Sequence, residues 1–281
     1  VVLGFALSLA SSVSWGLSDF LGGLQSRRMH VLAVVVLSQT VGLLLAVALL
    51  PVLGDAGLSA GDLAIAAAGG AAGAVGLIAF YAGMATGTIS VVSPIAALGV
   101  IVPVVVGLAR GEDPAPLQLG GAAVATAAVV LVSYEESNAD KRSASLRPIL
   151  LALVAALGFG CFFVAVDATA GHDAAWTIVG VRMGGVLVAV GAVIGTRPSF
   201  SLAAGAVWAI LAIGFFDVLA NSLYAVATTK GLLPVVAVGG SIYPAVTILL
   251  AYLVIGERLG TIRRAGVALA LTGIVMIAAG A

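Results

Sequence analysis

Two stretches of this chain, Tyr81–Val92 (YAGMATGTISVV) and Tyr224–Val236 (YAVATTKGLLPVV), resemble each other and lie about half a chain length apart. Each is followed further on by a Gly-Glu pair, Gly111-Glu112 or Gly256-Glu257, and then by a last apolar stretch. Internal repeats in an apolar chain are typical of transporter folds, which place the substrate site between the repeats. The repeat therefore predicts both the fold and the place of the functional site.

The composition predicts an integral membrane protein. Hydrophobic residues make up 62% of the chain and charged residues 9%, and the mean hydropathy is +1.25. A soluble domain is about 25% charged, so this chain has too few charges to cover a surface that faces water. The formal net charge of 0 gives no reason to expect a nucleic-acid partner.

The N-terminal segment is predicted to be a membrane span and not a cleaved signal peptide. Val1–Leu24 is apolar from its first residue, has no basic leading region and is longer than the apolar core of a signal peptide. Because the chain begins without methionine, we expect that a few native residues precede Val1.

Charged residues, prolines and glycines divide the chain into ten apolar segments, each long enough to cross a bilayer core as a helix of about 20 residues. A β-barrel is the alternative spanning architecture, but its strands would be shorter and would alternate in polarity. The sequence therefore predicts an all-α polytopic fold with ten transmembrane helices, at residues 3–25, 31–51, 62–86, 88–109, 117–133, 148–169, 174–195, 205–229, 232–255 and 261–280.

The longest polar stretch, Tyr134–Arg147, separates the ten segments into two sets of five. We predict a first five-helix repeat at residues 1–133, a polar connecting loop at 134–147 and a second five-helix repeat at 148–281. Five is an odd number, so the second set enters the membrane from the opposite side. The two repeats are therefore predicted to be inverted.

The distribution of Lys and Arg predicts one orientation of the chain in the membrane. Lys and Arg gather in the odd-numbered loops between segments, and the even-numbered loops carry only Arg110 and Lys230. The positive-inside rule then places the odd-numbered loops in the cytoplasm and both termini outside.

Several residues of each half stand at matching places. The first half contains Trp15-Gly16, Tyr81-Ala82, Ser93-Pro94, Gly111-Glu112 and a Gly-rich closing segment. The second half contains Phe159-Gly160, Arg182, Tyr224-Ala225, Gly256-Glu257-Arg258, Gly266 and Gly273. Together they resemble an EamA-type, ten-helix member of the drug/metabolite transporter superfamily over nearly the whole chain.

The resemblance implies two inverted five-helix repeats around a central cavity that moves small polar metabolites, amino acids or drugs, often as export. It also implies that both termini lie in the cytoplasm, against the charge count, so the orientation stays open. The chain departs from the family pattern at Gln39, where the second half has Arg182, and at Phe159, where the first half has Trp15.

Asp217 is the first candidate for a functional charge, because a charged side chain at the centre of a bilayer is costly without a partner or a water-filled cavity. One face of the predicted helix carries four polar side chains, those of Asp217, Asn221, Tyr224 and Thr228. The functional reading is a cavity lining that binds substrate or a proton. The alternative is a structural network of hydrogen bonds between helices.

Arg182 lies well inside the seventh segment. It could neutralise Asp217 or Asp19, or bind a carboxylate or phosphate of the substrate through two parallel hydrogen bonds. Alternatively, its long side chain could extend to the membrane interface. Gln39 is its predicted counterpart in the first half.

The first segment carries a polar stripe of Ser8, Ser12, Trp15 and Asp19. We predict that this stripe lines the cavity and that the Trp15 ring stacks on a substrate or holds a cation. With Tyr81 and Tyr243 from the matching stretches, the predicted substrate-binding residues are Trp15, Asp19, Gln39, Tyr81, Arg182, Asp217, Asn221, Tyr224 and Tyr243.

Helix breakers stand at roughly corresponding places in segments four and nine. Proline removes a backbone hydrogen bond and bends a helix, and paired interruptions of this kind point to a binding site. We predict hinges at Pro94, Pro244, Gly239 and Gly240, with adaptation to packing as the alternative. Glu112 and Glu257 are predicted to be structural, because each lies where a carboxylate can interact with a helix N-terminus.

These residues favour a secondary transporter in the inner cell membrane that moves small metabolites by alternating access. The alternatives are an uncoupled facilitator or channel and a non-transporting scaffold. No Walker A motif is present, so coupling would use an ion gradient, with protons carried by Asp217 or Asp19. The chain has a single cysteine, Cys161, which excludes a cysteine metal cluster, and no cofactor is expected. The sequence contains no enzymatic motif, so we do not predict an enzyme. It leaves open whether the protein is a monomer or a homodimer.

Overall fold

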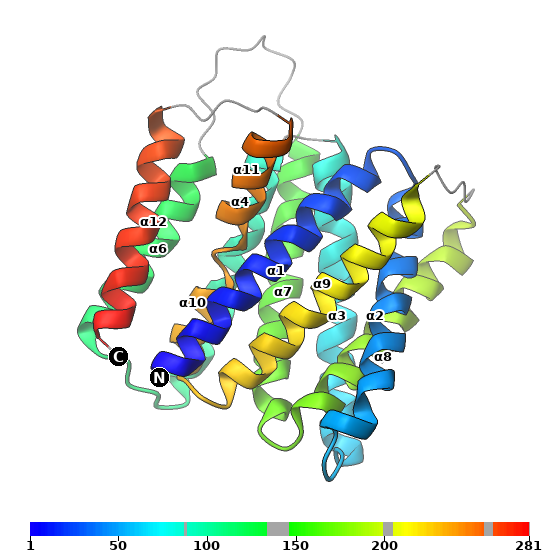
Figure 1. Cartoon of the computed structure of the whole chain (residues 1–281), viewed down its shortest axis with the longest axis horizontal. Coiled ribbons are helices and arrows are strands. Elements are labelled where there is room, and N and C mark those ends of the chain that lie inside the picture. The colour runs from blue at the N-terminus through cyan, green and yellow to red at the C-terminus, as the bar shows by residue number, and fades with distance from the viewer. Residues whose placement is uncertain (87–88, 134–145, 199–204, 256–260, 281) are drawn as a thin grey trace.

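The protein is described here from a computed structural model that covers residues 1–86, 89–133, 146–198, 205–255 and 261–280. Within these ranges the chain is helical and contains no strand (Figure 1). Gly256 and Glu257 lie outside them, as do residues 134–145 of the predicted connecting loop.

Each of the ten predicted segments coincides with one helix or with one broken helix. The first half contains α1 (Val2–Ser26), α2 (Val31–Leu53), α3 (Ala60–Thr86), α4 (Ile89–Ala97), the 3₁₀ turn η1 (Leu98–Val100), α5 (Ile101–Ala109) and α6 (Pro116–Ser133). The second contains α7 (Leu146–Ala170), α8 (Ala174–Thr196), α9 (Ala206–Thr228), α10 (Leu233–Gly240), α11 (Tyr243–Leu250), the π-helical turn η2 (Ala251–Ile255) and α12 (Thr261–Ala279).

Six helices in the described ranges are long and apolar enough to cross a membrane. They are α2, α3, α7, α8, α9 and the broken helix at 233–254. These helices make the chain a multi-pass membrane protein, and ten crossings remain a prediction.

The two broken helices have the same physical cause. Pro103 follows the break at η1, and Pro244 follows the break between α10 and α11. Proline has no N–H to give to the carbonyl four residues earlier, which for Pro244 is the carbonyl of Gly240. The hydroxyl of Ser12 in α1 donates to that oxygen at 2.7 Å instead.

Three of the four predicted hinge residues therefore stand at a break. Gly239 and Gly240 end α10, and Pro244 lies in the first turn of α11. The backbone of Pro94 lies inside α4, and the break comes later, before Pro103.

The two halves pack against each other through equivalent pairs of helices. Helix α1 packs on α9, and α3 packs on α7, so the first helix of each half lies against the third helix of the other. Helices α2 and α8 also pack together, as do α6 and α12. In Figure 1, α1 and α7 run through the bundle in opposite directions. Every one of these interfaces joins the halves.

Glycines allow these helices to approach closely. Gly184 of α8 lies against the backbone of Ala67, and Gly70 of α3 lies against the carbonyl of Val181. Gly69 and Gly73 face Ala165 and Phe162 of α7, so this small-residue face serves packing within the chain.

Four polar contacts join the halves at the end of the bundle where α2, α5, α7 and α9 finish. The carboxylate of Asp173 is central among them. It accepts hydrogen bonds from the N–H groups of Asp55 (2.9 Å) and Gly57 (3.1 Å) in the first half, and from Trp176 (3.0 Å) at the start of α8. One side chain thus caps α8 and holds the α2–α3 connection.

The other three contacts join different pairs of residues at the same end of the bundle. Arg110 pairs with Asp167 at 2.8 Å, and Nδ1 of His172 lies 3.3 Å from the carboxylate of Asp62. Glu112 accepts from the N–H of Leu233 at 2.7 Å. Glu112 therefore interacts with a helix N-terminus, as predicted, but with that of α10 in the opposite half.

Replacing Gly184 by alanine should destabilise the fold, because the added methyl group would meet the backbone of Ala67 and force α8 and α3 apart. We expect a loss of about 1–3 kcal/mol, measured by thermal unfolding of the purified protein in detergent. Gly191→Ala is the matched control on the same helix, since no atom lies within 4 Å of its added Cβ. Equal melting of both variants would contradict this packing.

Asp173→Ala should lower the free energy of unfolding by about 1–2 kcal/mol at neutral pH, because it removes a helix cap and two further hydrogen bonds. Burial raises the pKa of Asp173, but the N–H groups of Trp176, Asp55 and Gly57 outweigh it and lower the pKa below its ordinary value. A carboxyl whose pKa is lowered by folding stabilises the protein above its unfolded pKa of about 3.9 and loses this contribution as the pH falls through the folded pKa.

The difference in melting between wild type and Asp173→Ala should therefore shrink below about pH 3.9. Asp113→Ala, an exposed loop carboxylate, is the control and should melt as wild type. A difference that grows in acid would show that Asp173 does not act through its carboxylate.

Candidate functional site

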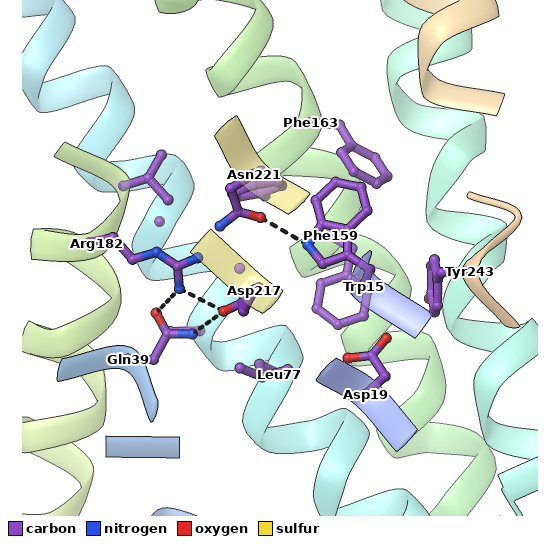
Figure 2. A pocket seen from close by; sticks show the side chains of 15 residues that line it. Trp15, Asp19, Gln39, Leu77, Phe159, Phe163, Arg182, Asp217, Asn221 and Tyr243 are labelled. Carbon is purple, nitrogen blue, oxygen red and sulfur yellow. Dashed lines mark hydrogen bonds and ion pairs between the residues drawn. The ribbon is translucent and has the colours of Figure 1, made fainter. Parts of the chain in front are cut away.

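A cavity lies between the two halves, lined by side chains of α1, α2, α3, α7, α8, α9 and α11 (Figure 2). Its volume is about 560 Å³, counting the part that opens to solvent. Small-molecule pockets are mainly apolar with a few polar groups. This cavity has that character, with three charged side chains among aromatic and small residues.

Arg182, Gln39 and Asp217 form a closed ring of hydrogen bonds at one side of the cavity (Figure 2). Nη1 of Arg182 donates to Oδ2 of Asp217 at 2.6 Å and to Oε1 of Gln39 at 2.9 Å. Nε2 of Gln39 donates to the same Asp217 oxygen at 3.1 Å. The side chain of Arg182 is only 1% exposed, so this ion pair offsets the cost of a deeply buried charge.

The ring joins three helices from both halves, and glycines make room for it. A Cβ at Gly42 would lie 3.2 Å from Cζ of Arg182, and a Cβ at Gly185 would lie 2.9 Å from Oε1 of Gln39. Among the alternatives predicted for Arg182, the structure shows the ion pair with Asp217. The side chain does not extend to the membrane interface.

Trp15 anchors the other side of the cavity. Its indole Nε1 donates to Oδ1 of Asn221 at 2.8 Å. Its ring packs against Phe162, Phe163 and Tyr224, with centroid distances of 6.2, 5.5 and 5.6 Å. These aromatic contacts between α1, α7 and α9 fix the orientation of the indole ring.

Asp19 lies one helical turn beyond Trp15 and also lines the cavity (Figure 2). It is 7% exposed, and none of the described residues forms a hydrogen bond or an ion pair with its carboxylate. The two aspartates of the cavity therefore differ in their partners, because Asp217 is paired with a cation and Asp19 is not.

The cavity brings together seven of the nine predicted substrate-binding residues: Trp15, Asp19, Gln39, Arg182, Asp217, Asn221 and Tyr243. Tyr81 and Tyr224 lie behind the lining. Tyr224 stacks beneath Trp15 and Phe163, and the hydroxyl of Tyr81 packs against Gly22 of α1. Their positions support the walls of the cavity, because neighbouring rings cover them.

The predicted serine stripe of α1 has a different use. Ser12 donates to the carbonyl of Gly240, and Ser8 donates to the carbonyl of Phe5 in its own helix. Two further serines, Ser11 and Ser18, donate to carbonyls of Ala220 and Ile213 in α9. The prediction that Ser8 and Ser12 line the cavity is wrong, because their hydroxyl groups donate hydrogen bonds to backbone carbonyls.

Sequence reasoning missed most of the aromatic wall. Phe159, Phe162 and Phe163 of α7 all line the cavity. Their spacing of three and four residues places them on one helical face, which was the available signal. That signal does not distinguish a cavity wall from an ordinary packed face.

The comparisons with known proteins agree with this arrangement. The model of the EamA-like transporter family matches residues 2–134 and, a second time, residues 146–279. The chain belongs to the EamA-like transporter family. Membership makes it a membrane transporter of small molecules, and the double match gives it the two-repeat architecture of the family.

Among solved structures, one that is described only as "Crystal structure of protein" is similar to this EamA-like transporter, with a TM-score of 0.76 and 16% sequence identity. The similarity covers 96% of each chain. At this identity the likeness shows a shared fold alone. No curated protein matches the chain.

In this EamA-like transporter, breaking the buried ion pair from either side should be costly. Arg182→Gln leaves Asp217 without its cation, and Asp217→Asn leaves Arg182 without its anion, so each should lose about 3 kcal/mol of stability. The double variant should lose less than the sum of the two, as thermal unfolding in detergent would show.

Arg110→Gln and Asp167→Asn form the matched control, because Arg110 is 45% exposed and solvent screens that pair. We expect losses of about 0.2–1 kcal/mol there. Additive losses at Arg182 and Asp217 would contradict a direct interaction between them.

Proposed function

We propose that this chain is a secondary transporter that moves a small organic solute through the central cavity by alternating access. The observation that carries the proposal is the position of the charges. Asp19, Arg182 and Asp217 lie deep in an apolar bundle and all line the same cavity between the two halves. A purely structural network would not need Asp19 to stay unpaired, because an isolated buried charge is costly.

The proposal includes the finer architecture that the sequence predicts. Ten spans in two inverted repeats, at residues 1–133 and 148–281, would place the cavity near the middle of the membrane, where such transporters bind substrate. The solute would be an amino acid, a related metabolite or a drug, carried outward across the inner cell membrane. Protons are the proposed coupling ion.

The four polar contacts at the end of the bundle where α2, α5, α7 and α9 finish favour alternating access over an open channel. All four of these polar contacts join opposite halves at the same end of the bundle. A carrier must close each end in turn, and contacts of this kind hold an end closed until the halves rotate. An open pore would have no use for them.

Transport into proteoliposomes tests the proposal. We expect saturable uptake of at least one radiolabelled compound from a panel of amino acids, aromatic amines, nucleosides and sugars. Exchange against the same unlabelled compound should be faster than net uptake. Arg182→Gln should reduce the rate at least tenfold, because the cavity loses its cation and its geometry, and Asp113→Asn should leave the rate unchanged.

Two results would contradict the proposal. Uptake that rises linearly with concentration, without acceleration by exchange, would identify a channel or facilitator. No uptake of any compound, by protein that melts cooperatively, would favour a scaffold.

A further inference from the structure

The cavity has one carboxyl group that no cation in the described structure pairs with. Asp217 is paired with Arg182, and Gln39 completes that ring. Asp19 has no such partner, although it is 93% shielded and lines the same cavity. A carboxylate in that position is stabilised when a cation enters the cavity.

The positive charge of Arg182 is already balanced in this arrangement. Its Nη1 is occupied by Asp217 and Gln39. Its Nε and Nη2 are buried and have no hydrogen-bond partner among the described residues. A cation can pair with Asp19 without displacing any contact of the ring that Arg182, Asp217 and Gln39 form.

The surroundings of Asp19 suit an apolar body attached to the cation. Trp15 precedes Asp19 by one helical turn, and Phe159 and Tyr243 lie beside it (Figure 2). Aromatic faces attract ammonium groups by cation–π interaction, most strongly at tryptophan, and also stack on flat apolar groups. The indole N–H already donates to Asn221, so the part of the Trp15 ring that lines the cavity is what remains for a ligand.

We infer that the cavity binds organic cations, with the ammonium group of the ligand paired to Asp19 and its apolar or aromatic body held among Trp15, Phe159 and Tyr243. This inference rests on the proposed function and specifies the substrate class of the same site. Sugars and nucleoside phosphates fit it poorly, because the former need more polar donors and the latter carry negative charge toward Asp19.

Four compounds with the same phenyl group test the headgroup directly: 2-phenylethylamine, phenylalanine, 3-phenylpropionate and 2-phenylethanol. Binding to the purified full chain is measured by isothermal titration calorimetry at low ionic strength. We expect the amine to bind at least tenfold more tightly than the neutral alcohol, and the propionate to bind most weakly. The order follows from one unpaired carboxylate at the site.

Asp19→Asn keeps the shape of the side chain and removes its charge. It should weaken binding of the amine 10- to 100-fold and leave binding of the alcohol unchanged, which also shows that the cavity is still folded. Asp19→Glu should retain a preference for the amine, and Asp113→Asn, which removes an equal charge from an exposed loop, should bind as wild type.

Several results would overturn the inference while leaving the transporter proposal intact. Tighter binding of phenylalanine that depends on Arg182 would show a zwitterion site, and tighter binding of the propionate would show an anion site. Equal binding of amine and alcohol, or no binding of any of the four, would also overturn it. The transporter proposal fails separately, if no compound enters the proteoliposomes or if uptake rises linearly with concentration and is not accelerated by exchange.

Discussion

An arginine and an aspartate can stay charged inside this apolar bundle only because each neutralises the other. Arg182 and Asp217 lie on neighbouring helices of the second half, and Gln39 brings a helix of the first half into the same ring. Their contact orders three helices around the cavity, and the small residues beside them, Gly42 and Gly185, leave the space that they need. The cavity exists because polar groups of α2, α8 and α9 meet where apolar side chains would otherwise close the interface.

The same need for partners explains the broken helices. A proline leaves a carbonyl without its helical donor, and in a bilayer water cannot replace that donor. Ser12 supplies the missing hydrogen bond at Gly240, so the break before Pro244 is stabilised by α1 of the opposite half. Glu112 does the same for the N-terminus of α10. Hydrogen bonds from the first half thus complete both ends of α10, which ties the broken helix to the walls of the cavity.

Much of this arrangement could be predicted from the sequence, because hydropathy and helix breakers determine where helices begin and end. The ten segments follow from the apolar runs, and the pair of Arg182 with Asp217 was one of the alternatives that rare polar residues in those runs indicated. Gln39 was predicted as the counterpart of Arg182 in the first half, but not as a hydrogen-bond partner of the pair. The uses of Ser8, Ser12, Tyr81 and Tyr224 could not be predicted in the same way. Their helical positions were correct, but whether a side chain faces space, a carbonyl or another ring depends on packing with helices distant in sequence. For the same reason, the wall formed by Phe159, Phe162 and Phe163 could not be told from an ordinary core.

The central claim is that the cavity between the halves opens to the aqueous phases, and thiol accessibility tests it most directly. Ala74 lines the cavity, and a cysteine there adds little volume. On a Cys161→Ser background, Ala74→Cys in oriented vesicles should react with a membrane-impermeant thiol reagent from one side at rest, and from both sides while a transported solute exchanges. Leu157→Cys, on the exposed apolar surface of α7, should not react from either side. An Ala74→Cys variant that is inert from both sides, in folded protein, would contradict the account.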